Sequence, residues 1–460
     1  MKLLEYSVEG ATDYNNIARM IHETGAYDYD SLYQSDLVGW SCLVVVLVSV
    51  TFLSVRHPRM FLILAIAFLV RTIAALFHFY VMPLPDGTGD ANKFDLWAFA
   101  YSADGWKEAF NWYPGARSHF YPWLMSLVYL VTGRSFLLLQ SISVFVGVLS
   151  VYATWLLGSE VWNDRAGRRA AWVMALFPTV VMYSALPLRE AYLTCILMFG
   201  LVWVARWSRE GKVRQAIWAM LLFGAGVFFH SSVFVLAFAF LVVIAWKMFS
   251  QGMSSFLQGR LRLTALAGLV VIVGALTLLG ANESRLDKLG SINQAVDFQS
   301  WVSYSQAKYY ADGRTGNAVY PGWTAPETVG DLVWAIPVKI IYLLFSPFPW
   351  DMRTPAHLIG VIDGLLYLGL IIIITRNIKT IWLNPAARTV LLVILPFIVA
   401  YGIGTSNFGT SIRHRAKFVG VLIMLSSFWF ARLVIRRKPI DSVENKIRQN
   451  QNITTGISNN

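Results

Sequence analysis

The sequence predicts an all-α protein, a polytopic bundle of transmembrane helices that carries loops and interfacial helices on its outer face. Hydrophobic residues make up 56% of the 460-residue chain and charged residues only 14%, too few for the surface of a soluble protein of this size. Apolar runs long enough to cross a bilayer recur along the chain. The loops between these runs alternate in charge, as they do in multi-spanning membrane proteins.

About eleven apolar runs approach the ~17–25 residues that a membrane-spanning helix needs. We expect the spans at residues 38–55, 60–82, 135–157, 170–187, 190–206, 214–230, 232–247, 263–281, 356–375, 388–404 and 417–434. An odd number of spans places the two ends of the chain on opposite sides of the membrane.

One set of connecting loops is basic, and the positive-inside rule makes these loops cytoplasmic. Its cations are Arg56, Arg59, Arg165, Arg168, Arg169, Arg206, Arg209, Lys212, Arg214, Lys247, Arg260, Arg262, Arg376, Lys379, Arg388, Arg436, Arg437 and Lys438. The other set is longer, more acidic and more aromatic, and we expect it to face outward. It comprises residues 1–37, 83–134, 187–190, 282–355 and 405–416.

This pattern divides the chain into an outer N-terminal segment (1–37), a transmembrane domain (38–435) and a disordered cytoplasmic tail (436–460). Two apolar segments of the outer loops, 119–133 and 336–350, are too short and too interrupted by proline to span. We expect them to form helices in the outer interface. The large outer loop also carries aromatic residues that could stack on a sugar: Trp301, Tyr304, Tyr309, Tyr310 and Trp323.

The net charge of +12 comes mostly from the basic loops. No basic stretch is interleaved with aromatic residues as in a reader of RNA or DNA, so we expect no nucleic-acid partner. Cys42 and Cys195 both lie in apolar runs and are expected to be buried thiols, and the sequence shows no metal-ligand spacing.

Three carboxylates follow the second span within the first outer loop: Asp86, Asp90 and Asp95. Gly87 and Gly89 permit a tight turn that would hold Asp90 close to the bilayer. From Asp90 onward the chain can be helical, with one face formed by Phe94, Trp97 and Tyr101. Asp90 is therefore either a general base or metal-binding carboxylate, or only a residue that caps this helix.

Charged residues also lie where spans turn at the outer face. Arg189 and Glu190 either face a polar cavity or close a helical hairpin as a structural pair. His230 lies at another outer turn, and Arg71 lies inside the second span. For these two residues, packing within the bundle is the more common role.

Cations gather just outside the last span, where they are normally sparse: Arg413, His414, Arg415 and Lys417. Gly409 and Thr410 precede them and would expose backbone N–H groups at a helix N-terminus, which favours anions. Arginine suits phosphate because it can donate two parallel hydrogen bonds. The cluster predicts a bound phosphate at the outer surface, and the alternative is non-specific contact with lipid phosphates.

The order of motifs resembles the GT-C membrane glycosyltransferases, which include protein O-mannosyltransferases and aminoarabinose transferases. The acidic first loop is followed by Tyr113-Pro114 and His119-Phe-Tyr-Pro-Trp, then Leu-Val-Thr-Gly133-Arg-Ser, Leu-Leu-Gly158-Ser-Glu-Val-Trp, Asn163-Asp-Arg-Ala-Gly-Arg-Arg169 and Ala-Leu-Phe-Pro178. The resemblance covers residues 83–200 best. Members of this family take a sugar from a polyprenyl-phosphate carrier at the outer face.

The resemblance implies that Asp90 is the catalytic aspartate of the first loop. The family often has a second acid beside it, whereas Ala91 follows here, which leaves a role for a metal open. Many members have an aspartate where this chain has Arg189-Glu190, which suggests a different carrier or acceptor. The Leu-Arg-Glu and Gly-Thr-x-x-Arg-His-Arg elements look like those of bacterial polysaccharide-cluster proteins, which implies the bacterial inner membrane with the site facing the periplasm.

The expected function is transfer of a sugar from a polyprenyl-(pyro)phosphate donor to an acceptor at the outer face. Asp90 would deprotonate the acceptor, and Arg413, Arg415 and Lys417 would hold the departing phosphate. Arg189 would be a further phosphate contact, and the supporting residues would be Glu190, His414, Asp86, Asp95 and His230. The expected partners are the lipid-linked sugar, membrane lipids and polysaccharide-assembly proteins, and a divalent cation is the one candidate cofactor.

Two other functions fit the same residues. A repeat-unit polymerase for an O-antigen or exopolysaccharide would use the same lipid pyrophosphate and arginines, with another lipid-linked glycan as acceptor. A flippase for lipid-linked sugars would need charges along a path across the bilayer, whereas nearly all lie at the outer rim. The transferase hypothesis requires Asp90 and Arg413 to line one outward site, within about 15 Å, the span of a sugar phosphate.

Overall fold

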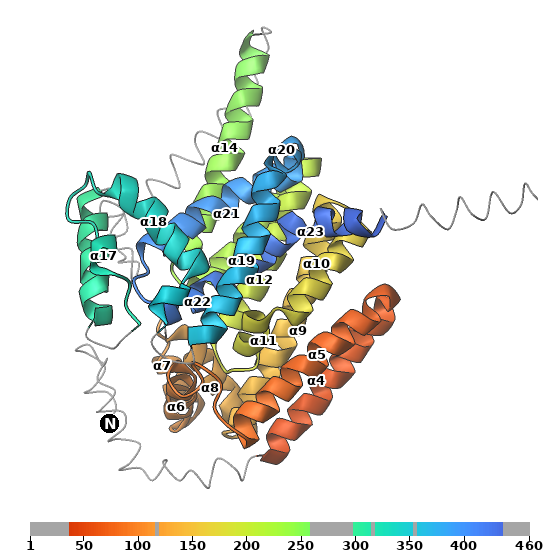
Figure 1. The fold of residues 1–460 in the computed structure, drawn as a ribbon. Coiled ribbons are helices and arrows are strands. Elements are labelled where there is room, and N and C mark those ends of the chain that lie inside the picture. The colour runs from red at the N-terminus through yellow and green to blue at the C-terminus, as the bar shows by residue number, and fades with distance from the viewer. Residues whose placement is uncertain (1–35, 116–118, 258–297, 314–317, 353–356, 436–460) are drawn as a thin grey trace, which may run out of the picture.

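The computed structural model of the chain describes residues 36–115, 119–257, 298–313, 318–352 and 357–435. These residues form helices joined by turns, and no strand occurs among them apart from one isolated bridge between Val319 and Asn407. The all-α membrane bundle that the sequence predicts is confirmed (Figure 1). The N-terminal segment, the expected span 263–281 and the C-terminal tail lie almost wholly outside the described residues.

Seven of the described helices are long and apolar enough to cross a membrane. They are α4 (Asp36–Arg56), α5 (Phe61–Tyr80), α9 (Phe136–Val161), α12 (Arg189–Glu210), α14 (Val233–Leu257), α19 (His357–Arg376) and α21 (Pro385–Ile403). The spans expected at 214–230 and 417–434 are the shorter apolar helices α13 (Val213–Phe229) and α23 (Val419–Ile435).

The span expected at 170–187 is not one helix. It is α10 (Asp164–Leu176) followed by α11 (Pro178–Ser184), because Pro178 has no N–H group and cannot continue the helix. The break leaves carbonyl groups without helical partners inside the bundle, where they need other donors. Arg71, which is wholly buried in α5, is such a donor. It donates hydrogen bonds to the carbonyl oxygens of Ala175 at 2.8 Å and Met174 at 3.2 Å. Arg71 therefore has the packing role that its place inside a span indicated.

The bundle is built around α9, which packs against α4, α5, α10 and α12. On the other side, α12 packs against α13 and α21, and α23 lies against α10 and α19. Most of α9 and α12 is buried in this way, whereas α4 and α14 expose apolar side chains to their surroundings. The elements around α12 thus form the centre of the molecule.

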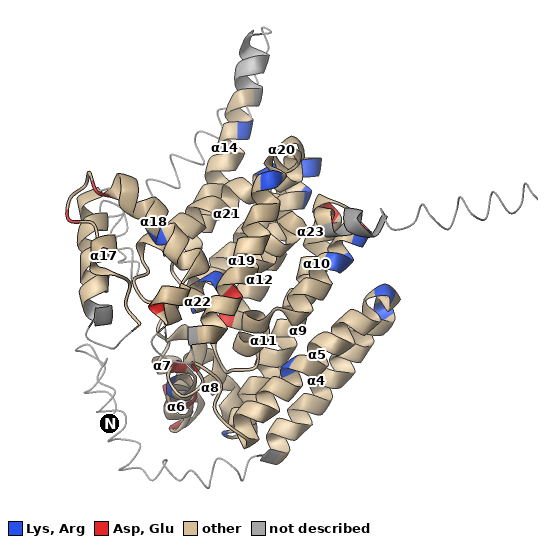
Figure 2. Ribbon diagram, in the orientation of Figure 1, with Lys and Arg blue, Asp and Glu red and all other residues tan. Residues whose placement is uncertain are grey.

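The charged loops gather at two ends of the bundle (Figure 2). At the basic end, Arg206 pairs with Glu160 at 2.7 Å, Arg59 pairs with Asp164 at 3.7 Å, and α20 (Ile378–Leu383) lies nearby. At the opposite end lie α6 (Asp90–Ser102), α7 (Gly105–Asn111) and α8 (Phe120–Thr132). This separation matches the two loop sets that the sequence distinguishes.

The segments expected at the outer interface are largely helical. Residues 119–133 correspond to α8, and residues 336–350 fall on α18 (Leu332–Phe345) and the short turn η3 (Pro349–Asp351). In the large outer loop, α17 (Phe298–Gly313) packs against α18, where Lys339 Nζ donates to Ser305 Oγ at 2.5 Å. A further short turn, η2 (Gly322–Thr324), lies between them in the chain.

Candidate active site

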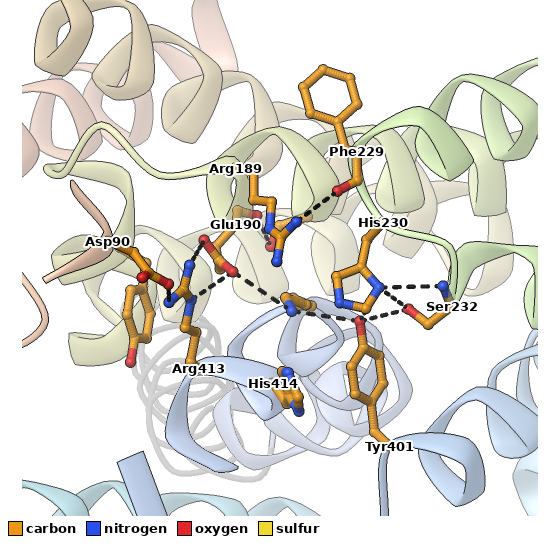
Figure 3. Close-up of polar contacts among 12 residues, drawn as sticks. Asp90, Arg189, Glu190, Phe229, His230, Ser232, Tyr401, Arg413 and His414 are labelled. Carbon is orange, nitrogen blue, oxygen red and sulfur yellow. Dashed lines mark hydrogen bonds and ion pairs between the residues drawn. The ribbon is translucent and has the colours of Figure 1, made fainter. Parts of the chain in front are cut away.

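Charged and polar side chains from four segments far apart in the sequence lie close together (Figure 3). Asp90 is the first residue of α6, and Arg189 and Glu190 open α12. Arg413 comes from the last turn of α22 (Phe408–Ala416), and His230 ends α13. The chain thus brings together charged side chains from both halves of the protein.

Arg413 is the centre of this group. Its Nε donates to Glu190 Oε1 at 2.7 Å and its Nη2 donates to Glu190 Oε2 at 3.2 Å, so Glu190 binds one edge of the guanidinium with both oxygens. Its Nη1 donates to Asp90 Oδ2. Burial lowers the pKa of Arg413, but the carboxylates of Glu190 and Asp90 outweigh it and hold that pKa above its usual value. Arg413 is therefore a permanent cation.

Glu190 also faces a second cation. Lys417 Nζ lies 3.6 Å from Glu190 Oε1 and donates to the Tyr401 hydroxyl at 3.5 Å. The Glu190 and Lys417 side chains are each only 1% exposed. Such buried charges are tolerated only when they are paired, so Glu190 is the counter-ion that permits Arg413 and Lys417 to sit here.

Arg189 is buried beside this group with few partners. Its Nη1 donates to the carbonyl oxygen of Phe229 at 3.3 Å, and its guanidinium lies 5.9 Å from the centre of the Phe94 ring. Its Nε is buried without a hydrogen-bond partner. A buried guanidinium with an unused donor is suited to a further anionic partner.

A network of polar groups continues from Lys417. Ser232 Oγ donates to the Tyr401 hydroxyl at 2.7 Å and lies 2.7 Å from His230 Nδ1. His414 Nδ1 lies 2.9 Å from Thr405 Oγ1, and its ring centre is 4.4 Å from that of Tyr401. His230 and His414 are thus held beside the charged group.

Comparison with protein families gives a match on the part of the chain that contains one half of this site. The family described as dolichyl-phosphate-mannose-protein mannosyltransferase matches residues 117–277. Residues 117–277 are therefore similar to this family, and the rest of the chain lies outside the match. The matched segment includes Arg189 and Glu190 but neither Asp90 nor Arg413.

Two solved structures have an arrangement of helices similar to that of this chain. One is the archaeal oligosaccharyltransferase AglB from Archaeoglobus fulgidus in complex with an inhibitory peptide and a dolichol-phosphate, at 13% identity and TM-score 0.46, over 88% of this chain and 53% of that one. The other is the Archaeoglobus fulgidus oligosaccharyltransferase in the apo form, at 16% identity and TM-score 0.44, over 84% and 52%. The chain thus spans about half the length of these proteins. No curated protein matches it.

Arg415 does not join the site around Arg413, contrary to our expectation. It is fully buried, and its Nε donates to Asp363 Oδ2 at 2.7 Å. Its other nitrogens donate to the carbonyl oxygens of Leu344, Ser346 and Gly360. Because these partners use its donors, Arg415 stabilises the packing of α22 against α18 and α19 and has none free for a phosphate.

The expected anion site at a helix N-terminus is also corrected. Arg413 and Arg415 lie in the last turn of α22, a separate short helix before α23. The N-terminus of α22 is capped by the Asn407 side chain, which accepts from the N–H groups of Gly409 at 2.8 Å and Thr410 at 3.3 Å. The cationic side chains, rather than backbone N–H groups, are therefore the phosphate-binding candidates.

The two other acids of the first loop have separate surroundings. Asp86 accepts from the Tyr183 hydroxyl at 2.9 Å and lies in the turn before Asp90. Asp95 is buried on another side of α6, where it accepts from Tyr129 at 2.5 Å and from Arg134 at 2.7 Å. Asp95 therefore holds α6 against α8 and does not reach Arg413.

We expect Asp95→Asn to destabilise the protein without changing the turnover of whatever reaction the site carries out. Hydrogen bonds to a buried charged group are typically worth about 1.5–3 kcal/mol, and Arg134 would lose its carboxylate. Thermal unfolding of the detergent-solubilised protein should show a lower midpoint. A fall in kcat of the folded fraction, measured below that midpoint, would contradict the structural role of Asp95.

Three residues of the site region were missed in the sequence. Tyr401 and Ser232 are ordinary polar residues near the ends of spans and gave no signal. Asp363 did give one, because a carboxylate within an apolar span needs a partner inside the bundle. Among the described residues, no three His, Cys, Asp or Glu side chains gather so as to hold a metal ion.

Proposed function

We propose that this protein transfers a sugar from a polyprenyl-(pyro)phosphate donor to a glycan, lipid or protein acceptor of the cell envelope. The reaction would take place at the outer face of the bacterial inner membrane. The observation that carries the proposal is the placement of Arg413 between Asp90 and Glu190. It puts a candidate base and a candidate phosphate ligand side by side at the end of the bundle away from the basic loops.

The donor phosphate would bind to the cations of this group. Arg413, Lys417 and Arg189 bring three positive charges, against the two negative charges of Glu190 and Asp90. The surplus favours an anion, and the unused Nε of Arg189 offers a donor for it. These side chains would also stabilise the negative charge that grows on the phosphate as the sugar leaves, which is the larger contribution to catalysis.

Asp90 would serve the acceptor. Its side chain is 42% exposed, so an acceptor hydroxyl can approach it from outside. In the transfer step the acceptor oxygen forms a bond to the anomeric carbon, and its proton passes to the Asp90 carboxylate. The bond from the anomeric carbon to the phosphate oxygen breaks, and its electron pair remains on the phosphate bound by the cations. The products are the glycosylated acceptor and the free lipid phosphate or pyrophosphate.

We expect Asp90→Asn to lower the transfer rate by about 10²–10⁴-fold, the usual contribution of a general base. The assay is transfer from radiolabelled polyprenyl-linked sugars in membranes that contain the variant, with and without a chelator to test for a divalent cation. Asp104→Asn is the matched control, because it removes an exposed carboxylate from the same outer segment. Its rate should equal that of the wild type.

The same assay separates the other functions. Full activity of Asp90→Asn together with loss of activity in Arg413→Ala would exclude the base and favour a repeat-unit polymerase. Accumulation of lipid-linked sugar only on the inner leaflet when the protein is absent would favour a flippase.

A further inference from the structure

The two carboxylates that hold Arg413 differ in how firmly they do so. Glu190 binds the edge formed by Nε and Nη2, and its side chain is 1% exposed. Asp90 binds Nη1 alone, and its side chain is 42% exposed. If Asp90 moved away, water could take its place on Arg413 at little cost. If Glu190 moved away, buried charges would be left unpaired, which is costly. Glu190 is therefore the fixed partner of Arg413 and Asp90 the exchangeable one.

The remaining edge of the guanidinium is the one that a phosphate needs. A guanidinium has two edges that can donate a parallel pair of hydrogen bonds, one formed by Nε with one terminal nitrogen and one formed by the two terminal nitrogens. Glu190 occupies the first edge. A phosphate that binds Arg413 through two hydrogen bonds must therefore use Nη1 and Nη2, and Asp90 already holds Nη1.

We propose that Asp90 occupies the position on Arg413 to which the donor phosphate binds. Its carboxylate becomes free to act as the base only when that phosphate has displaced it. The proposal rests on the function proposed above. The phosphate group displaces the Asp90 carboxylate from Nη1, while Glu190 keeps the guanidinium in position. Asp90 then turns toward the acceptor with its carboxylate free to accept a proton.

This exchange imposes an order on the reaction. Without the donor, the carboxylate of Asp90 is bound to Arg413. Once the donor is bound, the same event supplies the leaving-group contact and frees the base. Activation of the acceptor hydroxyl therefore follows donor binding.

The proposal gives Asp90→Asn a second and opposite effect. If Asp90 competes with phosphate for Arg413, its removal should strengthen binding of a lipid phosphate even though it lowers the transfer rate. Exposed ion pairs change equilibrium constants by about twofold to fivefold, so we expect an increase of that size in affinity.

The test is binding of farnesyl phosphate to the full-length protein in detergent, measured by calorimetry. The variants are Asp90→Asn, Asp104→Asn as the charge-matched control, and both Arg413→Ala and Arg413→Lys. We expect tighter binding in Asp90→Asn only, and weaker binding in both Arg413 variants. Arg413→Lys keeps a positive charge beside Glu190, so it preserves the test if Arg413→Ala does not fold.

The outcomes distinguish the exchange from the phosphate site itself. Unchanged or weaker binding in Asp90→Asn, with weaker binding in the Arg413 variants, would overturn the exchange and leave the proposed function standing. Equal tightening in Asp104→Asn would also overturn it, because the effect would then be general electrostatics. Unchanged binding in both Arg413 variants would remove the phosphate site and the proposed function with it.

Discussion

Arg413→Ala should abolish transfer. The variant loses the contact that stabilises charge on the departing phosphate, and loss of one such donor typically costs about 10²–10³-fold in kcat. It also leaves Glu190, which is buried, without the cation that binds both of its oxygens. We therefore expect a larger loss than in Asp90→Asn, measured as product formed from a radiolabelled lipid-linked donor.

Two further variants make this result specific. Arg413→Lys keeps the charge but cannot form paired hydrogen bonds, so we expect partial activity. Lys107→Ala removes an exposed cation of the same outer segment and should behave as the wild type. Wild-type activity in Arg413→Ala would show that the phosphate binds elsewhere.

Glu190→Gln should weaken both the fold and the reaction. The change keeps the shape of the side chain but removes the negative charge between Arg413, Lys417 and Arg189. Breaking a buried ion pair by removing one partner typically costs about 3–5 kcal/mol in the free energy of unfolding. Arg413 would also lose the partner that fixes its orientation, so transfer should fall even in the folded fraction.

Thermal unfolding of the solubilised protein measures the first effect, and turnover at a temperature below the unfolding midpoint measures the second. Glu210→Gln is the control, because that carboxylate pairs with Lys212 at the exposed basic end. Glu190→Asp should restore part of the stability. If Glu190→Gln unfolded at the wild-type temperature, the buried cations would have to find their counter-ion elsewhere.

Much of the architecture follows from the sequence, because the apolar runs and loop charges are local properties. The positions of α4, α5, α9, α12, α19 and α21 agree with the expected spans to within a few residues. The break at Pro178 was visible as a proline within an apolar run. The sequence did not show that the helix could end there. That depends on Arg71, which lies beside the break and donates hydrogen bonds to the carbonyl groups that the break leaves free.

The candidate site was only partly predictable. Asp90, Glu190 and Arg413 stood out because charges at the membrane surface are costly. The contact between Asp90 and Arg413 could not be predicted, because the two residues lie 323 positions apart in the chain. Arg415 was grouped with Arg413 because the two are close in the chain. Residues two apart on a helix point to different sides, so recognition of α22 as a helix would have separated them.

The opposite directions of Arg413 and Arg415 on α22 have a consequence for biosynthesis. The carboxylates that they neutralise, Glu190 and Asp363, belong to α12 and α19, which leave the ribosome earlier. Both acids therefore enter the membrane before their cations exist. Each carboxylate therefore lacks this partner until α22 docks against α12 and α19.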